Sequence, residues 1–320
     1  MFLKFQPFFL ISETPLHPGS GNELGLVDLP IQRERHTNFP KIEGSGLKGS
    51  IKEAFENSEK EIVMPNKGKQ GEKIKVKDYV SLIFGPESGN EHAAALAFMD
   101  AKILFFPVKS LRGIFAWITC PQVIERFKED MRMIKFNNDV ENFKAKEGTI
   151  PKDSNLVVSS KIVLEEYTFE VVPDDETTKI AKWFAEKIFP SKEPDIYKYW
   201  REKLMKDLVI LSDDEFKEFV STSTEVIART IIDDKKGTAK NLWYEEYLPQ
   251  NTILYSIAMA TAITEEEQRK GAFADETSEK EAEKVISYFK EGLHEVIQIG
   301  GNKTIGKGIT RIQLLEEGRP

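Results

Sequence analysis

Two stretches of this sequence combine apolar residues and glycine with basic side chains and contain no acid. Residues 101–120 and 296–312 have this composition, and their β-branched and aromatic residues favour strands joined by glycine turns. By contrast, residues 274–295 contain seven acids and three lysines, and their apolar residues recur at helical spacing. A sheet with basic loops, covered by acidic helices, satisfies both patterns. We therefore predict the α+β class.

Strand and helix patterns alternate along the chain without one clean period. No repeat of 20–50 residues and no proline- or glycine-rich linker is visible, so we predict a single domain over residues 1–320. Insertions are expected at about 57–93 and 137–223, and a projecting β-hairpin at about 224–250. The segment around residues 60–80 is rich in lysine and is predicted to be a solvated loop. The other expected elements are strands at 2–12, 94–107, 113–119, 161–171 and 208–211, and helices from 47, from 121, at 176–189, at 194–206 and from a capping box at 212–215.

Composition excludes several classes of protein. Cys120 is the one cysteine in the sequence, which rules out a disulfide framework and a cysteine-rich zinc site and favours a reducing compartment. No apolar run reaches the roughly 18 residues that a membrane helix needs, so we expect a cytoplasmic protein without a membrane partner. The net charge of −8 argues against a general nucleic-acid coat, which would have a basic excess.

A long irregular segment, dense in glycine, proline and charge, separates the first strand from the first helix. It covers residues 13–46, and loops of more than about 15 residues inside a domain are usually functional or disordered. The segment ends in Gly44-Ser45-Gly46-Leu47-Lys48-Gly49, where a helix begins at a glycine turn. Amides at a helix N-terminus, together with the Lys48 ammonium, are a ready anion site.

A second glycine loop with lysines lies near the end of the chain. Residues 300–308, GGNKTIGKG, contain Gly301, Lys303 and Lys307. The loop lacks the spacing of a phosphate-binding Walker loop, and a strand pattern rather than a helix follows it, so a nucleotide-dependent metabolic enzyme gets no support. Two such loops indicate a polyanion as ligand, although a purely structural tight turn remains the alternative.

Asp28 is the acid with the strongest functional signal. It lies between apolar neighbours in an otherwise polar loop, with Arg33 and Arg35 close behind it. Such a carboxylate can bind a divalent metal or accept a proton, and a salt-bridged loop residue is the structural alternative. His17 lies in the same loop, but the four histidines are too scattered for a zinc site.

The predicted hairpin has a lysine-bearing tip and an aromatic and acidic return strand. Lys235 and Lys236 lie at the tip, and the return reads Trp243-Tyr244-Glu245-Glu246-Tyr247. Aromatic rings can stack on unpaired bases, while packing in a core is the structural alternative.

Five stretches together resemble the repeated backbone subunit of the Cmr (type III-B) CRISPR effector, a member of the RAMP superfamily. They are spread over the whole chain, whereas 57–80 and 137–205 match nothing in that family. The five stretches are HPGSGNELGLVDLPIQRERH, GSGLKG, DAKILFFPVKSLRG, LWYEEYLP and QIGGNKTIGKG.

The resemblance implies a modified ferredoxin-like, RRM-like core with a hairpin thumb. It also implies several copies in a helical filament that binds guide crRNA and complementary target RNA, beside large, small and capping Cmr subunits. In that family a first-loop aspartate carries metal-dependent target cleavage, and Asp28 occupies that position, with Mg²⁺ or Mn²⁺ as the expected ion. His17, Glu245 and Glu246 are secondary catalytic candidates. The RNA-binding candidates are Arg35, Ser45, Lys48, Gly49, Arg112, Lys235, Lys236, Trp243, Tyr247, Gly301, Lys303 and Lys307.

Two alternatives remain open from the sequence. The first is a backbone subunit that holds guide RNA without cutting. The second is a stand-alone RAMP endonuclease that processes RNA with a histidine and needs no metal.

Overall fold

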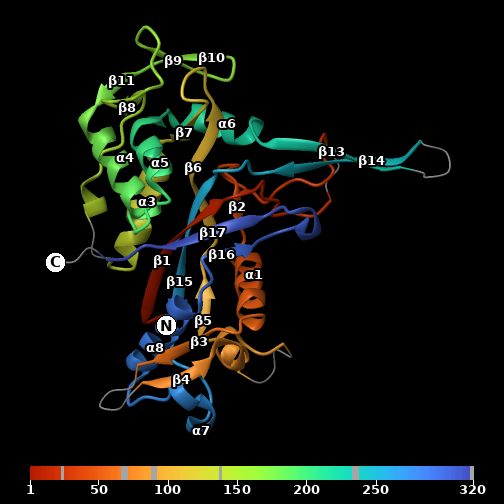
Figure 1. The fold of residues 1–320 in the computed structure, drawn as a ribbon, viewed down its shortest axis with the longest axis vertical. Coiled ribbons are helices and arrows are strands. Elements are labelled where there is room, and N and C mark those ends of the chain that lie inside the picture. The colour runs from red at the N-terminus through yellow and green to blue at the C-terminus, as the bar shows by residue number, and fades with distance from the viewer. Residues whose placement is uncertain (23–24, 66–70, 88–91, 137–138, 233–237, 318–320) are drawn as a thin grey trace.

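An eleven-stranded mixed sheet forms the centre of the molecule (Figure 1). The computed structural model describes residues 1–320 except 23–24, 66–70, 88–91, 137–138, 233–237 and 318–320. The strands of the sheet are β1 (Lys4–Ser12), β2 (Lys41–Ile42), β5 (Leu96–Phe98), β6 (Ala101–Lys109), β7 (Phe115–Thr119), β8 (Thr149–Pro151), β11 (Val172–Asp174), β12 (Leu208–Ile210), β15 (Ile253–Ala260), β16 (Val296–Gln298) and β17 (Ile309–Leu314). Their order is β11-β8-β12-β7-β6-β15-β1-β17-β16, with β2 paired to β6 and β5 to β15.

The remaining elements are hairpins and helices around this sheet. The hairpins are β3 (Glu61–Met64) with β4 (Glu72–Lys75), β9 (Lys161–Leu164) with β10 (Tyr167–Glu170), and β13 (Glu225–Ile232) with β14 (Ala239–Tyr247). The α-helices are α1 (Gly44–Glu56), α2 (Val80–Phe84), α3 (Pro121–Met133), α4 (Asp175–Ile188), α5 (Lys198–Lys206), α6 (Asp213–Thr222), α7 (Glu267–Lys270) and α8 (Ser278–Gly292). Short 3₁₀ turns are η1 (Val76–Tyr79), η2 (Asp139–Asn142), η3 (Gly271–Phe273) and η4 (Lys303–Ile305).

Strand β1 shows why the sheet is covered on both faces. It lies between β15 and β17 and is antiparallel to both, and every residue from its third onward is buried. Successive side chains point to opposite faces of a strand. Phe8 contacts Phe289 of the acidic helix α8, while Phe9 contacts Phe127 of α3 and Phe184 of α4. The predicted α+β class, with the acidic helix against the sheet, is confirmed.

Local signals predicted several element boundaries correctly. Helix α3 begins at Pro121, where the missing amide hydrogen of proline is harmless. Helix α6 begins with the predicted capping box, in which the Ser212 hydroxyl accepts the Glu215 amide at 3.3 Å and the Glu215 carboxylate accepts the Ser212 amide at 2.9 Å. These signals depend on residues close in sequence, so tertiary contacts do not overrule them.

Two predicted elements were wrong. The lysine-rich segment around 60–80 is not simply a loop, because it contains β3, β4 and η1, and the buried side chains of Ile62 and Ile74 alternate with its exposed charges. The single strand expected at 161–171 is the hairpin β9–β10, which turns at Glu165 with a φ of 50°. In both segments the many charged residues made the pattern hard to recognise in the sequence. The pattern was an alternation of apolar residues in β3 and β4 and a turn between β9 and β10.

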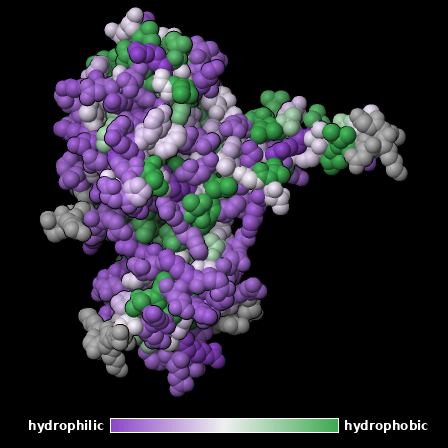
Figure 2. All heavy atoms as spheres, in the orientation of Figure 1, coloured by the Kyte–Doolittle hydropathy of each residue, from purple (hydrophilic) through white to green (hydrophobic). Residues whose placement is uncertain are grey.

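The hairpin β13–β14 projects from the body of the molecule (Figure 1). The hairpin expected at about 224–250 corresponds to β13 and β14, and the chain then continues into the sheet strand β15. Apolar side chains are exposed along the hairpin, as Figure 2 shows, and they include Val226, Ile231 and Leu242. Lys235 and Lys236 lie outside the described residues.

Candidate functional site

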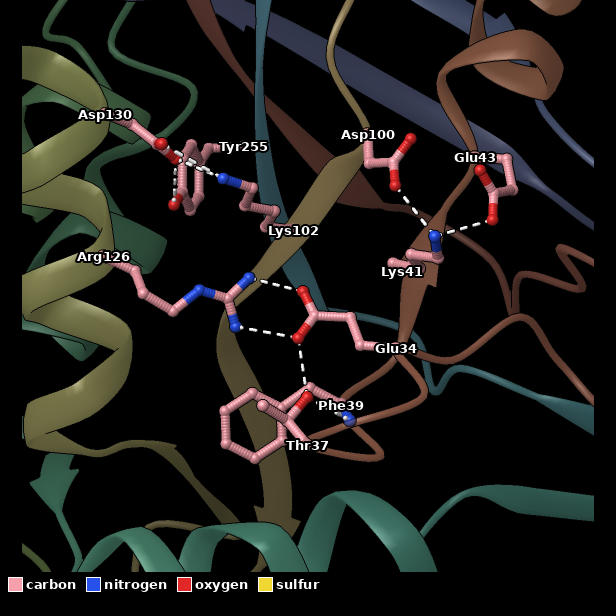
Figure 3. Close-up of polar contacts among 10 residues, drawn as sticks. All are labelled: Glu34, Thr37, Phe39, Lys41, Glu43, Asp100, Lys102, Arg126, Asp130 and Tyr255. Atoms are coloured by element: carbon pink, nitrogen blue, oxygen red, sulfur yellow. Dashed lines mark hydrogen bonds and ion pairs between the residues drawn. The ribbon is translucent and has the colours of Figure 1, made fainter. Parts of the chain in front are cut away.

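The first loop is held to the sheet and to α3 by ion pairs near its far end (Figure 3). Both terminal nitrogens of Arg126 donate to the Glu34 carboxylate, which also accepts the Thr37 hydroxyl at 2.6 Å. The Arg126 guanidinium lies 5.9 Å from the Phe39 ring centre. A bidentate arginine pair fixes direction as well as distance, so this segment of the loop has a defined position.

A second cluster positions the start of α1 (Figure 3). Lys41 Nζ lies 2.8 Å from Asp100 Oδ2 and 2.6 Å from Glu43, and the Gly44 amide donates to Asp100 Oδ1 at 2.8 Å. Burial acts to raise the pKa of Asp100, but the hydrogen bonds from Lys41 and Gly44 outweigh it and hold that pKa below its ordinary value. A Cβ on Gly44 would lie 2.6 Å from the Phe98 carbonyl oxygen, so this position requires glycine.

A third cluster joins α3 to the sheet strands beneath the loop (Figure 3). Asp130 accepts Lys102 Nζ at 2.7 Å and the Tyr255 hydroxyl at 2.8 Å. Burial raises the pKa of Tyr255 well above its ordinary value, so the phenol remains a hydrogen-bond donor.

The glycine loop at 300–308 crosses directly over the first loop. The Gly301 amide donates to the His17 carbonyl at 2.9 Å, and the Gly308 amide to the Pro15 carbonyl at 2.9 Å. Gly300 has a φ of +77°, and a Cβ there would lie 2.3 Å from the His17 carbonyl oxygen. The glycines therefore serve close packing of two loops, and the Gly301 amide, which we expected to bind RNA, is already used within the protein.

The base of the hairpin contacts the same two loops. Asn302 Nδ2 donates to Glu245 Oε2 at 2.9 Å and to the Tyr247 hydroxyl at 2.8 Å. Glu245 also accepts Trp243 Nε1 at 2.8 Å and binds Arg229 and Tyr247. Burial opposes ionisation of Glu245, but these donors together lower its pKa. The carboxylate is therefore a buried anion that joins the hairpin to the glycine loop.

The neighbouring acid, Glu246, faces the first loop. Its carboxylate lies 2.5 Å from Arg33 Nη2 and accepts the Ile31 amide at 3.0 Å and the Thr224 hydroxyl at 2.8 Å. Both Glu245 and Glu246 are buried and bonded within the chain. Their burial and internal hydrogen bonds favour a supporting role over direct contact with a substrate, and a catalytic role for them stays a prediction.

His17 and Tyr247 are also less accessible than expected. His17 Nδ1 donates to the Glu246 carbonyl at 2.6 Å, which leaves Nε2 as an acceptor on the side of Gly19. Tyr247 is buried, and its ring lies 5.4 Å from that of His17, so it is not free to stack on a base as we predicted. Trp243 is half-buried, and the exposed aromatic ring of this strand is Tyr244.

These elements enclose a cleft of about 460 Å³. The first loop, α1 and the glycine loop each contribute to its wall, and the lining residues are His17, Pro18, Gly19, Gly21, Leu29, Gln32, Ile42, Gly46, Ser50, Ile299, Gly300 and Gly301. A larger hollow of about 740 Å³ beside α4 is lined by none of the predicted site residues. The two glycine loops that the sequence marked as anion sites therefore share one cleft.

Asp28 lies at the edge of this cleft, next to Leu29 in its wall. Its side chain is exposed, and Oδ2 accepts the Tyr244 amide at 2.8 Å. No described residue donates to Oδ1. The Leu29 amide donates to the Tyr244 carbonyl at 3.0 Å, so the loop pairs with the free edge of β14. The hairpin thus fixes one carboxylate oxygen of an exposed side chain.

The lysines near the cleft differ in whether an acidic side chain of the protein pairs with them. Lys48 is half-buried, and burial together with the charge of Lys52 lowers its pKa. Lys303 lies 2.5 Å from Glu53, whereas Lys307 Nζ lies 5.0 Å from the centre of the Tyr247 ring. In the part of the chain that the structure describes, no acid forms an ion pair with Lys48, and a cation without an acidic partner attracts an external anion.

The other predicted RNA-binding residues divide into two groups. Ser45 and Gly49 are exposed on α1, and Arg35 is exposed on the first loop. Arg112, however, lies in the turn between β6 and β7, where it donates to the Val157 carbonyl at 2.8 Å. The structure does not bring Arg112 to the cleft, because β6 carries that turn to another part of the sheet (Figure 1).

A metal ion would find few ligands in this chain alone. The described residues contain no cluster of three His, Cys, Asp or Glu side chains that could hold one. Asp28 offers one exposed carboxylate, and Mg²⁺ commonly binds one or two carboxylates together with substrate phosphates. The residues present do not form a resident metal site, and phosphate oxygens would have to complete one.

Comparisons with known proteins agree with this architecture. The sequence profile of the RAMP superfamily matches residues 9–311, so the chain belongs to the RAMP superfamily. The Cmr endoribonuclease Cmr4 of Pyrococcus furiosus is 36% identical over 315 residues, covering 96% of this chain and 94% of the relative. Within the superfamily, the chain therefore belongs to the Cmr4 (Cas7) backbone subunits of type III-B Cmr complexes.

One further relative and two solved structures are also similar to this chain. The CMR subunit Cmr4 of Saccharolobus solfataricus is 23% identical, covering 98% of this chain and 97% of the relative. A crystal structure of oligomeric Cmr4 from Pyrococcus furiosus superposes with a TM-score of 0.67 at 29% identity, covering 99% of this chain and 100% of that one. A type III-B Cmr-beta structure with cognate target RNA contains a chain with the same fold, at a TM-score of 0.71 and 20% identity over 98% of both chains. Among the described helices, none is long and apolar enough to cross a bilayer.

Proposed function

We propose that this chain is the backbone subunit of a type III-B CRISPR effector that binds guide and target RNA and cuts the target. Asp28 supports this proposal most directly. Its exposed carboxylate lies at the edge of a cleft that two glycine loops form, at the base of a projecting hairpin. The similarity to a Cmr endoribonuclease over 96% of the chain agrees with RNA as substrate.

RNA binding would rest on contacts that do not depend on sequence. The amides of Ser45 and Gly46 lie in the first turn of α1, where the helix dipole favours a phosphate. Lys48 follows within one turn of the helix and would supply a cation. Such contacts bind any guide sequence, because they address the backbone and not the bases.

Cleavage would proceed by attack of a ribose 2′-hydroxyl on the neighbouring phosphorus. The O2′–P bond forms and the P–O5′ bond breaks, which gives a 2′,3′-cyclic phosphate and a 5′-hydroxyl end. Oδ1 of Asp28 would accept the proton of the 2′-hydroxyl, while the Tyr244 amide keeps Oδ2 in place, and solvent water would protonate the leaving 5′-oxygen. The hairpin favours the in-line arrangement by separating the bases on either side of the scissile linkage.

A divalent metal ion, Mg²⁺ or Mn²⁺, is part of the proposal. Asp28 would supply one ligand and RNA phosphates the others. The ion would neutralise charge on the phosphate, and the copies of the chain along the guide would give cuts at regular intervals.

Replacing Asp28 tests the chemistry, because Asp28→Asn keeps an oxygen that accepts the Tyr244 amide but removes the negative charge. We expect target cleavage by the assembled complex to fall at least about 100-fold, with guide and target affinity within about twofold of the unchanged chain. Asp153→Asn, at an exposed aspartate away from the cleft, is the matched control. EDTA should give the same loss as Asp28→Asn, and Mg²⁺ or Mn²⁺ should reverse it.

Other outcomes would favour the alternatives. Spaced cutting that survives Asp28→Asn supports a scaffold subunit whose partners cut. Cutting that survives EDTA but is lost in His17→Ala supports a metal-independent nuclease that uses the Nε2 atom of His17.

A further inference from the structure

Asn302 joins the glycine loop to the base of the hairpin. Its Nδ2 atom donates to Glu245 Oε2 at 2.9 Å and to the Tyr247 hydroxyl oxygen at 2.8 Å. The backbone of Asn302 is left-handed, with a φ of +65°, a conformation that glycine and asparagine adopt more readily than other residues. Its carbonyl accepts the amides of Ile305 and Lys307 at 3.1 and 3.3 Å. One residue therefore holds the turn of the glycine loop and also contacts β14.

The two acceptors require the amide group of Asn302. Burial opposes ionisation of Glu245, but its hydrogen-bond donors lower its pKa, and an ionised carboxylate can only accept hydrogen bonds. The Tyr247 hydroxyl uses its own hydrogen on the same carboxylate, so its oxygen can only accept from Asn302. A carboxylate at position 302 would face two acceptors and could donate to neither.

The contact with Glu245 leads directly to Asp28. Glu245 follows Tyr244 in β14, and the Tyr244 amide is the donor that holds Asp28 Oδ2 at 2.8 Å. The Leu29 amide also donates to the Tyr244 carbonyl at 3.0 Å. The position of residues 28 and 29 therefore depends on where β14 lies, and Asn302 fixes the side chain next to Tyr244.

We propose that Asn302 is a positioning residue for target cleavage, because it sets the place of Asp28 through β14. This inference rests on the proposed function, in which Asp28 accepts the proton of the 2′-hydroxyl. A displacement of about 1 Å at the reacting atoms costs up to about 100-fold in rate. Gly300 and Gly301 of the same loop line the cleft, so Asn302 connects the wall of the cleft to Asp28.

Two substitutions change the donor and keep the left-handed backbone. Asn302→Gly removes the side chain at a φ that glycine tolerates. Asn302→Asp keeps the shape of the side chain but places a second carboxylate beside Glu245. In the complex assembled with guide RNA, we expect the single-turnover cleavage rate at saturating target to fall about 10-fold in Asn302→Gly. It should fall further in Asn302→Asp, because the two carboxylates repel each other. Target affinity should stay within about twofold in both.

The matched control is Asn251→Gly. Asn251 also has a left-handed backbone, with a φ of +69°, and no described residue forms a hydrogen bond with its side chain. This variant should change neither rate nor affinity.

Hydrogen exchange of peptides that cover β14 gives a second readout, which does not depend on cutting. Exchange should be faster in Asn302→Gly than in wild type, because β14 and the Tyr244 amide are held less firmly. Exchange of β1, in the centre of the sheet, should stay the same.

Several outcomes would overturn the proposal. An unchanged rate in both variants would do so, as would an Asn302→Asp variant that cuts like wild type, since shape alone would then suffice. Equal losses of rate and affinity would assign Asn302 to RNA binding instead. If the wild-type complex binds target but does not cut it, the proposed function fails. Exchange of β14 then decides whether Asn302 positions Asp28: faster exchange in Asn302→Gly supports it, and unchanged exchange contradicts it.

Discussion

At the scale of single residues, the structure separates groups that look alike in the sequence. Asp28, Glu245 and Glu246 are all acids near predicted RNA-binding segments. Glu245 and Glu246 each have several donors inside the protein, whereas Asp28 has one backbone donor and an exposed side chain. Spacing alone could not distinguish them, because the donors Asn302 and Thr224 come from other elements.

The glycines of the 300–308 loop give a prediction about stability. Gly300 and Gly306 have nearly the same φ, +77° and +75°, but their surroundings differ. A Cβ added at Gly300 would lie 2.3 Å from a backbone oxygen of His17, whereas one added at Gly306 would have no described atom within 4 Å. Gly306→Ala should therefore lower the free energy of unfolding by about 1–2 kcal/mol from backbone strain. Gly300→Ala should lower it by roughly 2–5 kcal/mol, because a clash with His17 is added.

Urea unfolding of both variants measures this difference. Equal losses in the two variants would contradict the close approach of the glycine loop to the first loop, and the cleft would then be less defined than described.

At the scale of elements, α1 and the hairpin meet at the first loop. Helix α1 begins at Gly44, where Asp100 accepts its first amide, and β14 takes the Leu29 segment as a short additional pairing. The loop is thus fixed near its middle and at its far end by different elements. The length of this loop indicated either function or disorder from the sequence. In the structure the loop is long because it connects α1 with the hairpin.

The Asp100 carboxylate gives a pH prediction for α1. Its folded-state pKa lies below that of the unfolded chain, because the bonds from Lys41 and the Gly44 amide outweigh the effect of burial. The stabilisation is therefore complete above the unfolded value of about 3.9 and is lost as the pH falls through the lower folded value. Asp100→Asn should be less stable than wild type at neutral pH, and the gap should narrow below about pH 4.

Denaturant titrations from pH 2 to 8 would follow that gap. A gap that stays constant across the acid range would show that the charge of Asp100 does not hold the helix start. Asp153→Asn should show no comparable effect at any pH, since Asp153 is exposed.

At the scale of the whole molecule, the proposed anion site belongs to a protein of net charge −8. Acids of α8 pair with lysines, for example Glu279 and Glu283 with Lys4, on an element that contacts the sheet away from the cleft. The cleft itself is lined by Gly46 and Ser50 of α1 and by Gly300 and Gly301 of the glycine loop, and Lys48 lies on the same helix outside that lining. Binding of a polyanion depends on this local field more than on the net charge.

Removing the side-chain charges of Lys48 and Lys307 tests whether local positive charge contributes to RNA binding. Lys48→Ala combined with Lys307→Ala should weaken RNA binding and reduce the slope of log affinity against log salt by about 0.7 for each single-strand phosphate that the variant no longer neutralises. Lys303→Ala is the control, because Lys303 is paired with Glu53 and should change the slope less. An unchanged affinity and slope in the double variant would remove the phosphate role from these loops.

The sequence by itself determined the α+β class, the starts of α3 and α6, and the identity of Asp28 as the acid to test. Those features follow from periodicity, from capping residues and from a carboxylate between apolar neighbours in a polar loop, all of which depend on neighbours in the chain. Only the tertiary structure decided that Glu245, Glu246 and Tyr247 are buried, that Arg112 lies away from the cleft, and that Tyr244 is the exposed ring. Burial and hydrogen bonding depend on contacts between distant residues, such as Asn302 with Glu245 or Asp28 with Tyr244, and no local pattern encodes them.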